Sequence, residues 1–222
     1  MRQILAFAAV LALIAPAPAQ DKEKEEGFAP IFNGKDLDDW VYGTKGNAGK
    51  AGEGYKVDAE NKIVYCTVKD GGNLYTKKEY GDFVLRFEFK LTVNANNGIG
   101  IRAPLEGDAA YVGMEIQVLD DSGPAYKNLR PEQYHGSVYD LFACKRGLQK
   151  PVGEWNEEEI YAKGPNIKVT LNGTVIVDAN LEDVKDEKKI AKHPGIKNAK
   201  GHIGFLGHGA RVEFRNLRVK DL

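Results

Sequence analysis

Polar side chains that can transfer protons alternate with hydrophobic residues in two short segments. In residues 99–102 and 114–119, this alternation directs Arg102, Glu115 and Gln117 away from the hydrophobic side of the expected strands. A carboxylate can act as a general acid or base, and a guanidinium can stabilise developing negative charge. These three residues are therefore candidates for a catalytic or ligand-binding face.

A third segment, residues 202–208, carries two histidines at positions of equal parity. Alternation puts His202 and His208 on one strand face, while Gly204 and Gly207 leave room there for a ligand or a close backbone approach. Histidine transfers protons near neutral pH. Histidines that serve only the strand itself are the alternative interpretation.

Residues 134–140 form a second cluster of polar groups. The segment brings an imidazole, hydroxyl groups and a carboxylate together through His135, Tyr139 and Asp140. Such groups bind sugars and move protons. The alternative is a turn whose tyrosine and aspartate make local hydrogen bonds.

An aromatic residue next to an amide lies in an expected loop, Gly153–Asn156. Trp155 and Asn156 pair an apolar plate with a hydrogen-bonding fork, which suits a sugar ring. Trp155 could equally anchor the core together with Trp40, because large aromatic side chains are mostly buried.

The stretch from Glu115 to Asp120 has the shape of the Glu-x-Asp-x-x-Glu strand of retaining glucanases. In those enzymes two carboxylates about 5 Å apart act as nucleophile and acid/base. Here Gln117 replaces the middle aspartate, and Asp120 has the opposite parity to Glu115 unless a bulge intervenes. The segment resembles that motif in architecture more than in mechanism.

Motifs for other chemistries are absent from the sequence. It contains no Gly-x-Ser-x-Gly, no phosphate-binding glycine loop and no cysteine-rich zinc pattern. A divalent metal held by His135, His202, His208 and nearby carboxylates is conceivable, since imidazole and carboxylate suit Zn²⁺ or Mn²⁺. No cofactor is indicated with certainty.

Many short strands position these residues. Residues 83–91 alternate strictly, and Asn172-Gly173 between two β-branched runs predicts a hairpin with a type I′ turn. Helical patterning is confined to residues 181–191 and a turn near residues 130–134. The pattern favours an all-β antiparallel sandwich. Further expected strands cover residues 63–68, 72–75, 111–119, 202–208 and 212–219.

Length and charge narrow the class of protein. After a leader, about 200 of the 222 residues remain, which fits one domain. The formal net charge of -1 suggests neither a nucleic-acid partner nor a membrane-surface partner. Cys66 and Cys144 are the only cysteines, and they could form a disulfide or stay free and buried.

The N-terminus reads as a secretory signal peptide. Arg2 precedes a short apolar run, and Ala17-Pro18-Ala19 is a small-x-small cleavage site. We expect a signal peptide over residues 1–19, a charged tether over 20–28 and a single domain over 29–222. Cleavage near Ala19 predicts export to the periplasm or the extracellular space, without a membrane anchor.

Eight segments, in order from residue 30 to the C-terminus, together resemble the 3-keto-disaccharide hydrolase domain family of exported bacterial proteins. The segments are PIFNGKDLDDW, YGDFVLRFEFKLTVNANNGIGIR, GMEIQVLDD, YHGSVYDL, PVGEWNE, IKVTLNGTVIVD, HPG and GHIGFLGHGARVEFRNLRVKDL. Many family members carry Leu-Gln-Asp-His-Gly near the end, where this chain has Leu206 and Gly207 in place of Gln and Asp and keeps His208.

The resemblance implies a concanavalin A-like jelly-roll sandwich of two antiparallel sheets. It also implies a sugar substrate already oxidised to a ketone at carbon 3, and therefore a sugar 3-dehydrogenase acting upstream. Family positions, together with the face arguments above, place ten residues in the expected groove. As catalytic candidates they are Arg102, Glu115, His135 and His208, and as substrate-binding candidates Gln117, Asp120, Tyr139, Trp155, Asn156 and His202.

The mechanism expected from this resemblance begins with elimination. A base, His208 or His135, removes the hydrogen on carbon 2, Arg102 or a bound cation stabilises the enolate, and Glu115 protonates the leaving group. Two other functions stay open. One is retaining hydrolysis of unoxidised glycans by Glu115 and Asp120, and the other is a non-catalytic sugar-binding module.

Overall fold

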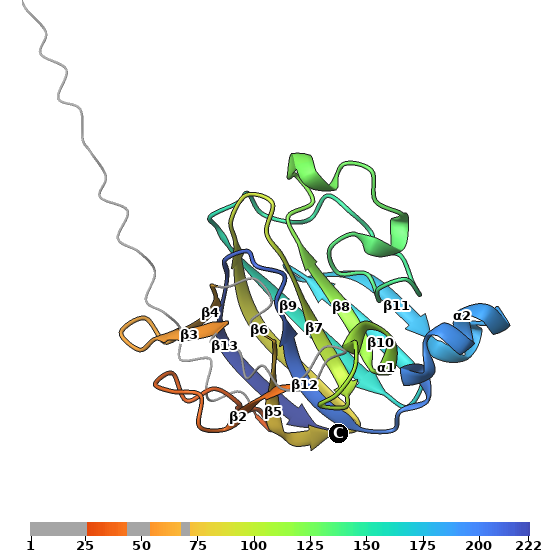
Figure 1. Ribbon diagram of the computed structural model, residues 1–222, viewed down its shortest axis with the longest axis horizontal. Helices are drawn as coiled ribbons and strands as arrows, with labels where there is room; N and C mark the ends of the chain where they lie inside the picture. The colour runs from red at the N-terminus through yellow and green to blue at the C-terminus, as the bar shows by residue number, and fades with distance from the viewer. Residues whose placement is uncertain (1–25, 44–53, 68–71) are drawn as a thin grey trace, which may run out of the picture.

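Two antiparallel β-sheets pack face to face in the computed structural model, which describes residues 26–43, 54–67 and 72–222 (Figure 1). The eight-stranded sheet has the order β11-β10-β9-β6-β13-β4-β3, with β1 paired to β13, and the five-stranded sheet has the order β2-β5-β12-β7-β8. The predicted all-β sandwich of two antiparallel sheets is confirmed. The strands are β1 Ala29–Pro30, β2 Trp40–Gly43, β3 Tyr55–Asp58, β4 Ile63–Cys66, β5 Asn73–Tyr80, β6 Phe83–Leu91, β7 Asn96–Ala103, β8 Met114–Leu119, β9 Trp155–Lys163, β10 Asn166–Leu171, β11 Thr174–Asn180, β12 Gly201–Leu206 and β13 Val212–Asp221.

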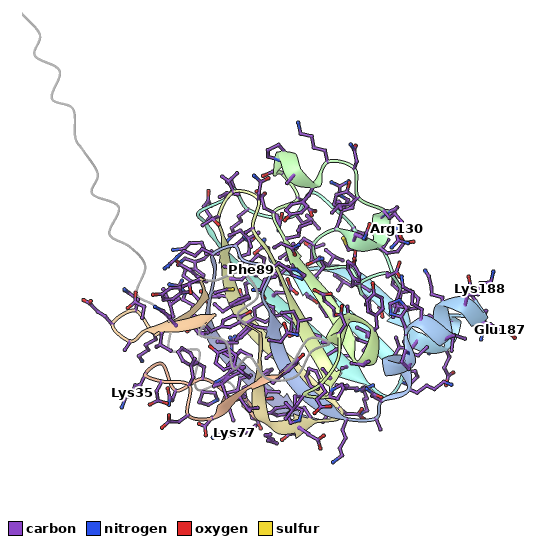
Figure 2. The ribbon with its side chains drawn as sticks, viewed as in Figure 1. Lys35, Lys77, Phe89, Arg130, Glu187 and Lys188 are labelled. Atoms are coloured by element: carbon purple, nitrogen blue, oxygen red, sulfur yellow. The ribbon has the colours of Figure 1, made fainter. Side chains whose placement is uncertain are left out.

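The core lies between the two sheets. In β6 the alternate residues Phe87 and Phe89 are fully buried, as the strict alternation of this strand predicts (Figure 2). Phe205 of β12 stacks on Phe214 of β13, with ring centroids 4.3 Å apart, and so joins the two sheets. Burying large aromatic rings of this kind is the main stabilisation that a sandwich has.

The hairpin between β10 and β11 forms as predicted. Asn172 and Gly173 both have positive φ, 49° and 82°, which matches the twist of the adjoining strands.

Helices are short and lie outside the sandwich. The structure contains α1 Ala109–Val112 and α2 Glu187–Lys192, capped by the side chains of Asp108 and Asp186. The helix expected over residues 181–191 is therefore wrong in extent, because the segment divides into a 3-10 turn, Leu181–Asp183, and α2. The strand expected from residue 111 begins instead at Met114, after α1. The other 3-10 turns are η2 Pro124–Tyr126, η3 Pro131–Gln133 and η5 Pro194–Lys197.

A backbone irregularity interrupts β7 at Arg102. His202 pairs with Ala103 and Gly204 with Gly100, so β7 carries one more residue than β12 between these pairs. Arg102 takes a positive φ of 47°, as a bulged residue can. A bulge re-aims a side chain, and simple alternation therefore fails at this position.

The free edge of β8 is covered by the segment of residues 136–139. Gly136 N donates to Gln117 O, Gln117 N donates to Ser137 O, and Tyr139 N donates to Glu115 O. This short pairing ties a loop directly to the strand that carries the candidate carboxylate.

Three further predictions concern the whole chain. Cys66 and Cys144 do not form a disulfide with each other. No helix in the described ranges is long and apolar enough to cross a membrane. The proposed signal peptide and most of the charged tether lie outside the described residues.

Candidate functional site

The outer face of the five-stranded sheet collects polar side chains from several strands. Strand register places Glu115 and Gln117 of β8 on the same face as Gly98 of the neighbouring strand β7. Asn73 and Tyr75 of β5 lie on this face as well, on the far side of β12 from β7. We call this set the outer sheet face.

Glu115 lies across the neighbouring strand. A Cβ added at Gly98 would sit only 2.0 Å from Glu115 Oε1, so the carboxylate occupies the space that a side chain at position 98 would need. Glu115 is 4% exposed. Gly98 therefore leaves the space in which the candidate acid/base group of Glu115 lies. The sequence pattern did not indicate this role of Gly98.

Tyr75 is a second functional candidate that the sequence did not single out. Its ring packs against Gly204, where a Cβ would lie 2.2 Å from Tyr75 Cδ1, so the ring fills the room expected above that glycine. Asn73 Nδ2 donates to the Tyr75 hydroxyl at 3.2 Å. Burial, the largest influence, raises the pKa of Tyr75 to about 12, and the charges of Asp108 and Glu115 add to this effect while the bond from Asn73 opposes it. The phenol therefore stays protonated at neutral pH.

His202 borders this face, and His208 lies beyond the end of the strand. His202 Nδ1 donates to Thr76 O at 2.7 Å, and its ring meets the Tyr75 ring edge-on at 6.4 Å. The strand expected over residues 202–208 ends at Leu206, because Leu206 pairs with Asn73, the first residue of β5. The prediction that strand alternation orients His208 is wrong, since His208 is exposed in the following loop.

Arg102 does not face the predicted groove. Its Nε donates to Gly81 O at 2.9 Å, Nη1 to Gly164 O at 2.8 Å, and Nη2 to Asp82 Oδ1 at 3.1 Å. The side chain is 3% exposed and ties the β5–β6 turn to the β9–β10 turn. The left-handed backbone at this bulge directs it there, so Arg102 is a structural tie rather than an enolate stabiliser.

His135 lies in the interior instead of the groove. Its ring packs against Phe89 with centroids 4.9 Å apart, and its Nε2 lies 3.1 Å from Glu158 Oε2 of β9. His135 Nδ1 accepts from Leu119 N, which leaves the proton of a neutral ring on Nε2, toward Glu158. Because Phe89 and Glu158 both belong to the eight-stranded sheet, the His135 ring lies on the core side of the five-stranded sheet and not on the outer sheet face.

Trp155 and Asn156 belong to the other sheet. Trp155 is the first residue of β9. Two cations lie over its ring, with Arg215 Cζ 3.9 Å and Lys90 Nζ 4.9 Å from the ring centroid. Asn156 is buried, and its Oδ1 accepts from Lys150 N and Asn172 Nδ2. The prediction that this pair lines the groove is wrong, because both residues belong to β9, a strand of the eight-stranded sheet where the sequence predicted a loop.

Asp120 organises a loop at the end of β8. Its Oδ2 accepts from Asn94 N, and its Oδ1 accepts from the backbone and hydroxyl of Ser122. With both oxygens engaged, Asp120 does not pair with Glu115 as a second catalytic carboxylate, and we do not assign it to the substrate.

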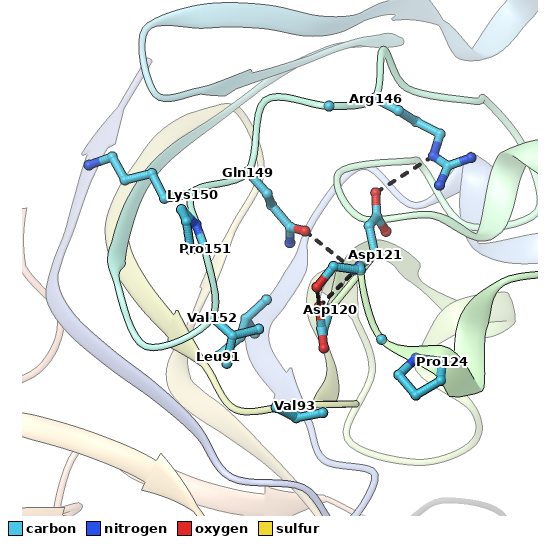
Figure 3. Close-up of a pocket in the computed structure, with 13 residues that line it drawn as sticks. Leu91, Val93, Asp120, Asp121, Pro124, Arg146, Gln149, Lys150, Pro151 and Val152 are labelled. Atoms are coloured by element: carbon cyan, nitrogen blue, oxygen red, sulfur yellow. Dashed lines mark hydrogen bonds and ion pairs between the residues drawn. The ribbon is translucent and has the colours of Figure 1, made fainter.

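Asp120 also lines the wall of a cavity of about 810 Å³ at the loop end of the sandwich (Figure 3). One wall of this cavity is apolar and the other carries polar groups that mostly bond to one another. Gln149, for example, donates to Leu119 O and accepts from Asp121 N. None of the described residues that line the cavity is aromatic. Its lining is Leu91, Val93, Asp120, Asp121, Ser122, Gly123, Pro124, Arg146, Gly147, Gln149, Lys150, Pro151 and Val152.

Asp140 stands at the centre of a charged cluster beside the outer sheet face. Arg130 Nη2 bonds to its Oδ1, while Lys192 Nζ and His193 Nε2 lie 2.6 Å and 3.1 Å from its Oδ2. Burial alone would raise the pKa of Asp140, but the bonds from Lys192, His193 and Arg130 outweigh it and hold that pKa well below its ordinary value. The sequence singled out Asp140, but nothing in it indicated that Lys192 and His193 meet it.

A metal site is not supported by this arrangement. Among the described residues, no three histidine, cysteine, aspartate or glutamate side chains come together in a way that could hold an ion. His135 is enclosed in the core and His202 bonds to the backbone, so the histidines proposed as ligands do not converge.

Comparison with known proteins gives a consistent result. Residues 27–220 match the model of the 3-keto-alpha-glucoside-1,2-lyase-like domain. A protein of Bacteroides thetaiotaomicron named 3-keto-disaccharide hydrolase is 26% identical, and the match covers 89% of this chain and 79% of that protein.

Solved structures share the fold. A Parabacteroides distasonis protein with the provisional name glycosyl hydrolase superposes with a TM-score of 0.71 at 23% identity, over 91% of this chain and 97% of that one. A second structure with the same name and source gives a TM-score of 0.70 at 24% identity, over 88% and 99%. A Bacillus subtilis protein with a galectin-like fold gives 0.56 at 12% identity, over 87% and 94%.

Proposed function

Because this chain belongs to the 3-keto-alpha-glucoside-1,2-lyase-like domain family, we propose that it cleaves glycosides that carry a ketone at sugar carbon 3. The outer sheet face is the proposed place of reaction. The name of the Bacteroides relative, 3-keto-disaccharide hydrolase, supports the same substrate class.

The chemistry needs no nucleophilic carboxylate pair. The ketone at carbon 3 acidifies the hydrogen on carbon 2, and a base takes that proton to leave an enolate. The enolate expels the oxygen substituent on carbon 1, which takes a proton from an acid. Water then adds across the new double bond, so the net result is hydrolysis.

Glu115 is the proposed acid for the leaving group, and its placement is the observation that carries the proposal. Its carboxylate lies over Gly98 on the outer sheet face, with the protonated phenol of Tyr75 on the same face. A carboxyl group is one of the side chains that donate protons in such steps. Gln117, Tyr139 and His202 are the proposed contacts to the sugar hydroxyls.

His208 is the proposed base. The other histidine considered for this role, His135, is buried against Phe89 and Glu158. His208 is exposed two residues after the end of β12, and the last residue of β12, Leu206, lies on the outer sheet face. Imidazole is suited to proton abstraction near neutral pH.

The reaction also has a place in a sequence of steps. Its substrate must already be oxidised at carbon 3, so an enzyme that oxidises this carbon has to act first. We propose that both steps take place after export, in line with the signal peptide expected over residues 1–19.

The test compares a chromogenic 3-keto-glucoside with its unoxidised parent. We expect release of the chromophore from the keto sugar alone, loss of this activity in Glu115→Gln and in His208→Ala, and full activity in Trp155→Ala. Trp155→Ala is the matched control, because that ring lies on the opposite sheet under Arg215 and Lys90.

Three outcomes would overturn the proposal. Cleavage of the parent glucoside would support an ordinary glycosidase. Binding of the keto sugar without turnover would support a sugar-binding module. Turnover that is unchanged in both Glu115→Gln and His208→Ala would remove the reaction from the outer sheet face.

A further inference from the structure

We propose that Asp140 is a positioning residue that holds Glu115 in its working place, through a clamp formed with Arg130, Lys192 and His193. This inference rests on the proposed function for its kinetic part, and on the backbone contacts of the described residues for its structural part.

The clamp gathers four residues from separate parts of the fold. Asp140 lies in the loop after β8, Arg130 precedes η3, Lys192 ends α2, and His193 caps that helix. Asp140 is 2% exposed and His193 is fully buried, while Arg130 and Lys192 reach in from the surface.

His193 connects the clamp to the helix over the outer sheet face. Its Nδ1 lies 3.2 Å from Ala110 O in α1, and its Nε2 lies 3.1 Å from Asp140 Oδ2. A carbonyl and a carboxylate only accept, so both contacts are hydrogen bonds when each ring nitrogen carries a proton. α1 packs on β7 and β8, and Ala109 lies above Gly100.

The clamp reaches Glu115 through one residue of backbone. Asp140 follows Tyr139 directly, and Tyr139 N donates to Glu115 O at 2.9 Å. Asp140 N itself donates to Glu132 O at 3.0 Å, which holds the other side of the loop. Fixing Asp140 therefore fixes the segment of residues 136–139, which pairs with β8 on the edge where the described part of the chain places no other strand of the five-stranded sheet.

The backbone of Asp140 supports this role. Its φ is 59°, in the left-handed region, which is unfavourable for a residue with a Cβ. Such a conformation persists where the surroundings over-determine it. Burying the Asp140 carboxylate and the His193 ring is also costly, because their desolvation offsets part of the attraction to Arg130 and Lys192, which stay largely exposed. An arrangement with both features is better explained by the need for a defined geometry at β8.

The test uses Asp140→Asn in the full chain. Asparagine tolerates the left-handed backbone and keeps the size of the side chain, but it loses the charge that holds the two cations and the imidazole. We expect kcat on the 3-keto-glucoside to fall by about ten- to a hundred-fold with little change in KM, because a shift of about 1 Å in a reacting group can cost that much. We also expect faster amide hydrogen exchange in residues 136–139 and in β8.

Glu213→Gln is the matched control. Glu213 is a largely buried carboxylate held by two cations, Lys90 and Arg211, on the eight-stranded sheet. Its loss should lower stability without changing kcat or the exchange of β8. Kinetics are measured at a temperature where both variants are fully folded.

Each outcome decides the matter. Faster exchange in β8 together with lower kcat in Asp140→Asn alone supports the clamp. Unchanged exchange, unchanged kcat, or equal losses in Glu213→Gln would overturn it. If the wild-type chain turned over no 3-keto-glucoside, the proposed function would fail, and the exchange measurement would still decide whether the clamp orders β8.

Discussion

Gly98→Ala is the substitution that most directly tests whether Glu115 works on the outer sheet face. The new Cβ would lie 2.0 Å from Glu115 Oε1, whereas ordinary contact begins at 3.4 Å, so the oxygen must move by about 1.4 Å. Glu115 Cδ and Cγ would also lie only 2.7 Å and 2.8 Å from the new Cβ, so the whole side chain must turn while the backbone stays in place.

The magnitudes separate an effect on rate from an effect on stability. A displacement of this size in a group that transfers a proton is expected to lower kcat about 100-fold, or about 2.7 kcal/mol in the barrier. Gly98 does not have a positive φ, so alanine fits its backbone. The gain from a less flexible unfolded chain, about 0.4–1 kcal/mol, roughly offsets an off-rotamer cost of about 0.5–1.5 kcal/mol at Glu115. Stability should therefore change by less than about 1 kcal/mol.

The assay is steady-state release of the chromophore from a 3-keto-glucoside, together with urea denaturation. Gly100→Ala is the control on the same strand and the same face. Its Cβ would meet Leu206 Cδ2 at 3.3 Å and the Cβ of Ala109 at 3.6 Å, which needs an adjustment of only a few tenths of an ångström. Wild-type kcat in Gly98→Ala, or equal losses in both variants, would refute the reasoning.

Three further predictions address the other groups. Arg102→Lys should lower the free energy of unfolding, measured in urea, by about 2–4 kcal/mol, because an ammonium cannot replace the three hydrogen bonds of the guanidinium. The kcat per folded molecule should stay unchanged, and a selective loss of kcat would contradict this prediction. The pKa of Asp140 is depressed in the folded state, so its contribution to stability is present above its unfolded pKa of about 4 and is lost as pH falls through the folded value. The difference in stability between the wild type and Asp140→Asn should therefore shrink below about pH 4. A difference that stays constant with pH would contradict the clamp. Burial raises the pKa of Tyr75 and of Tyr80 to about 12, so phenolate absorbance should show tyrosines that titrate above pH 11, with one fewer in Tyr75→Phe. An unchanged late component in Tyr75→Phe would contradict the raised pKa of Tyr75.

Alternation predicted the strands well where they pair regularly. In β6 the predicted inward set is buried, and in β8 the predicted outward set, Glu115 and Gln117, lies on the face opposite the core. The same rule failed at Arg102, because a bulge with a left-handed residue turned the side chain toward two turns at the end of the sandwich. It also failed at His208, because the ladder ends two residues earlier.

Other errors came from contacts between distant segments. The sequence around His135 fits a loop that turns toward solvent as well as a loop that folds into the core. Only the contacts of His135 with Glu158 and Phe89 show that it folds into the core. Trp155 and Asn156 form a credible sugar-binding pair in isolation, but their strand joins the sheet opposite Glu115. The clamp on Asp140 could not have been found from spacing, since Lys192 and His193 lie more than fifty residues away in the chain.

The amino-acid sequence alone determined the all-β class, the positions of several strands, the hairpin at Asn172-Gly173 and the family resemblance, but it did not predict β9. These features depend on local periodicity, turn chemistry and short motifs, which are properties of neighbouring residues. Only the tertiary structure decided which candidates share a face, because sheet membership, bulges and loop direction follow from pairings between residues far apart in the chain. For this reason Glu115 stayed with the outer sheet face, while Arg102, His135 and Trp155 were assigned to structural roles elsewhere.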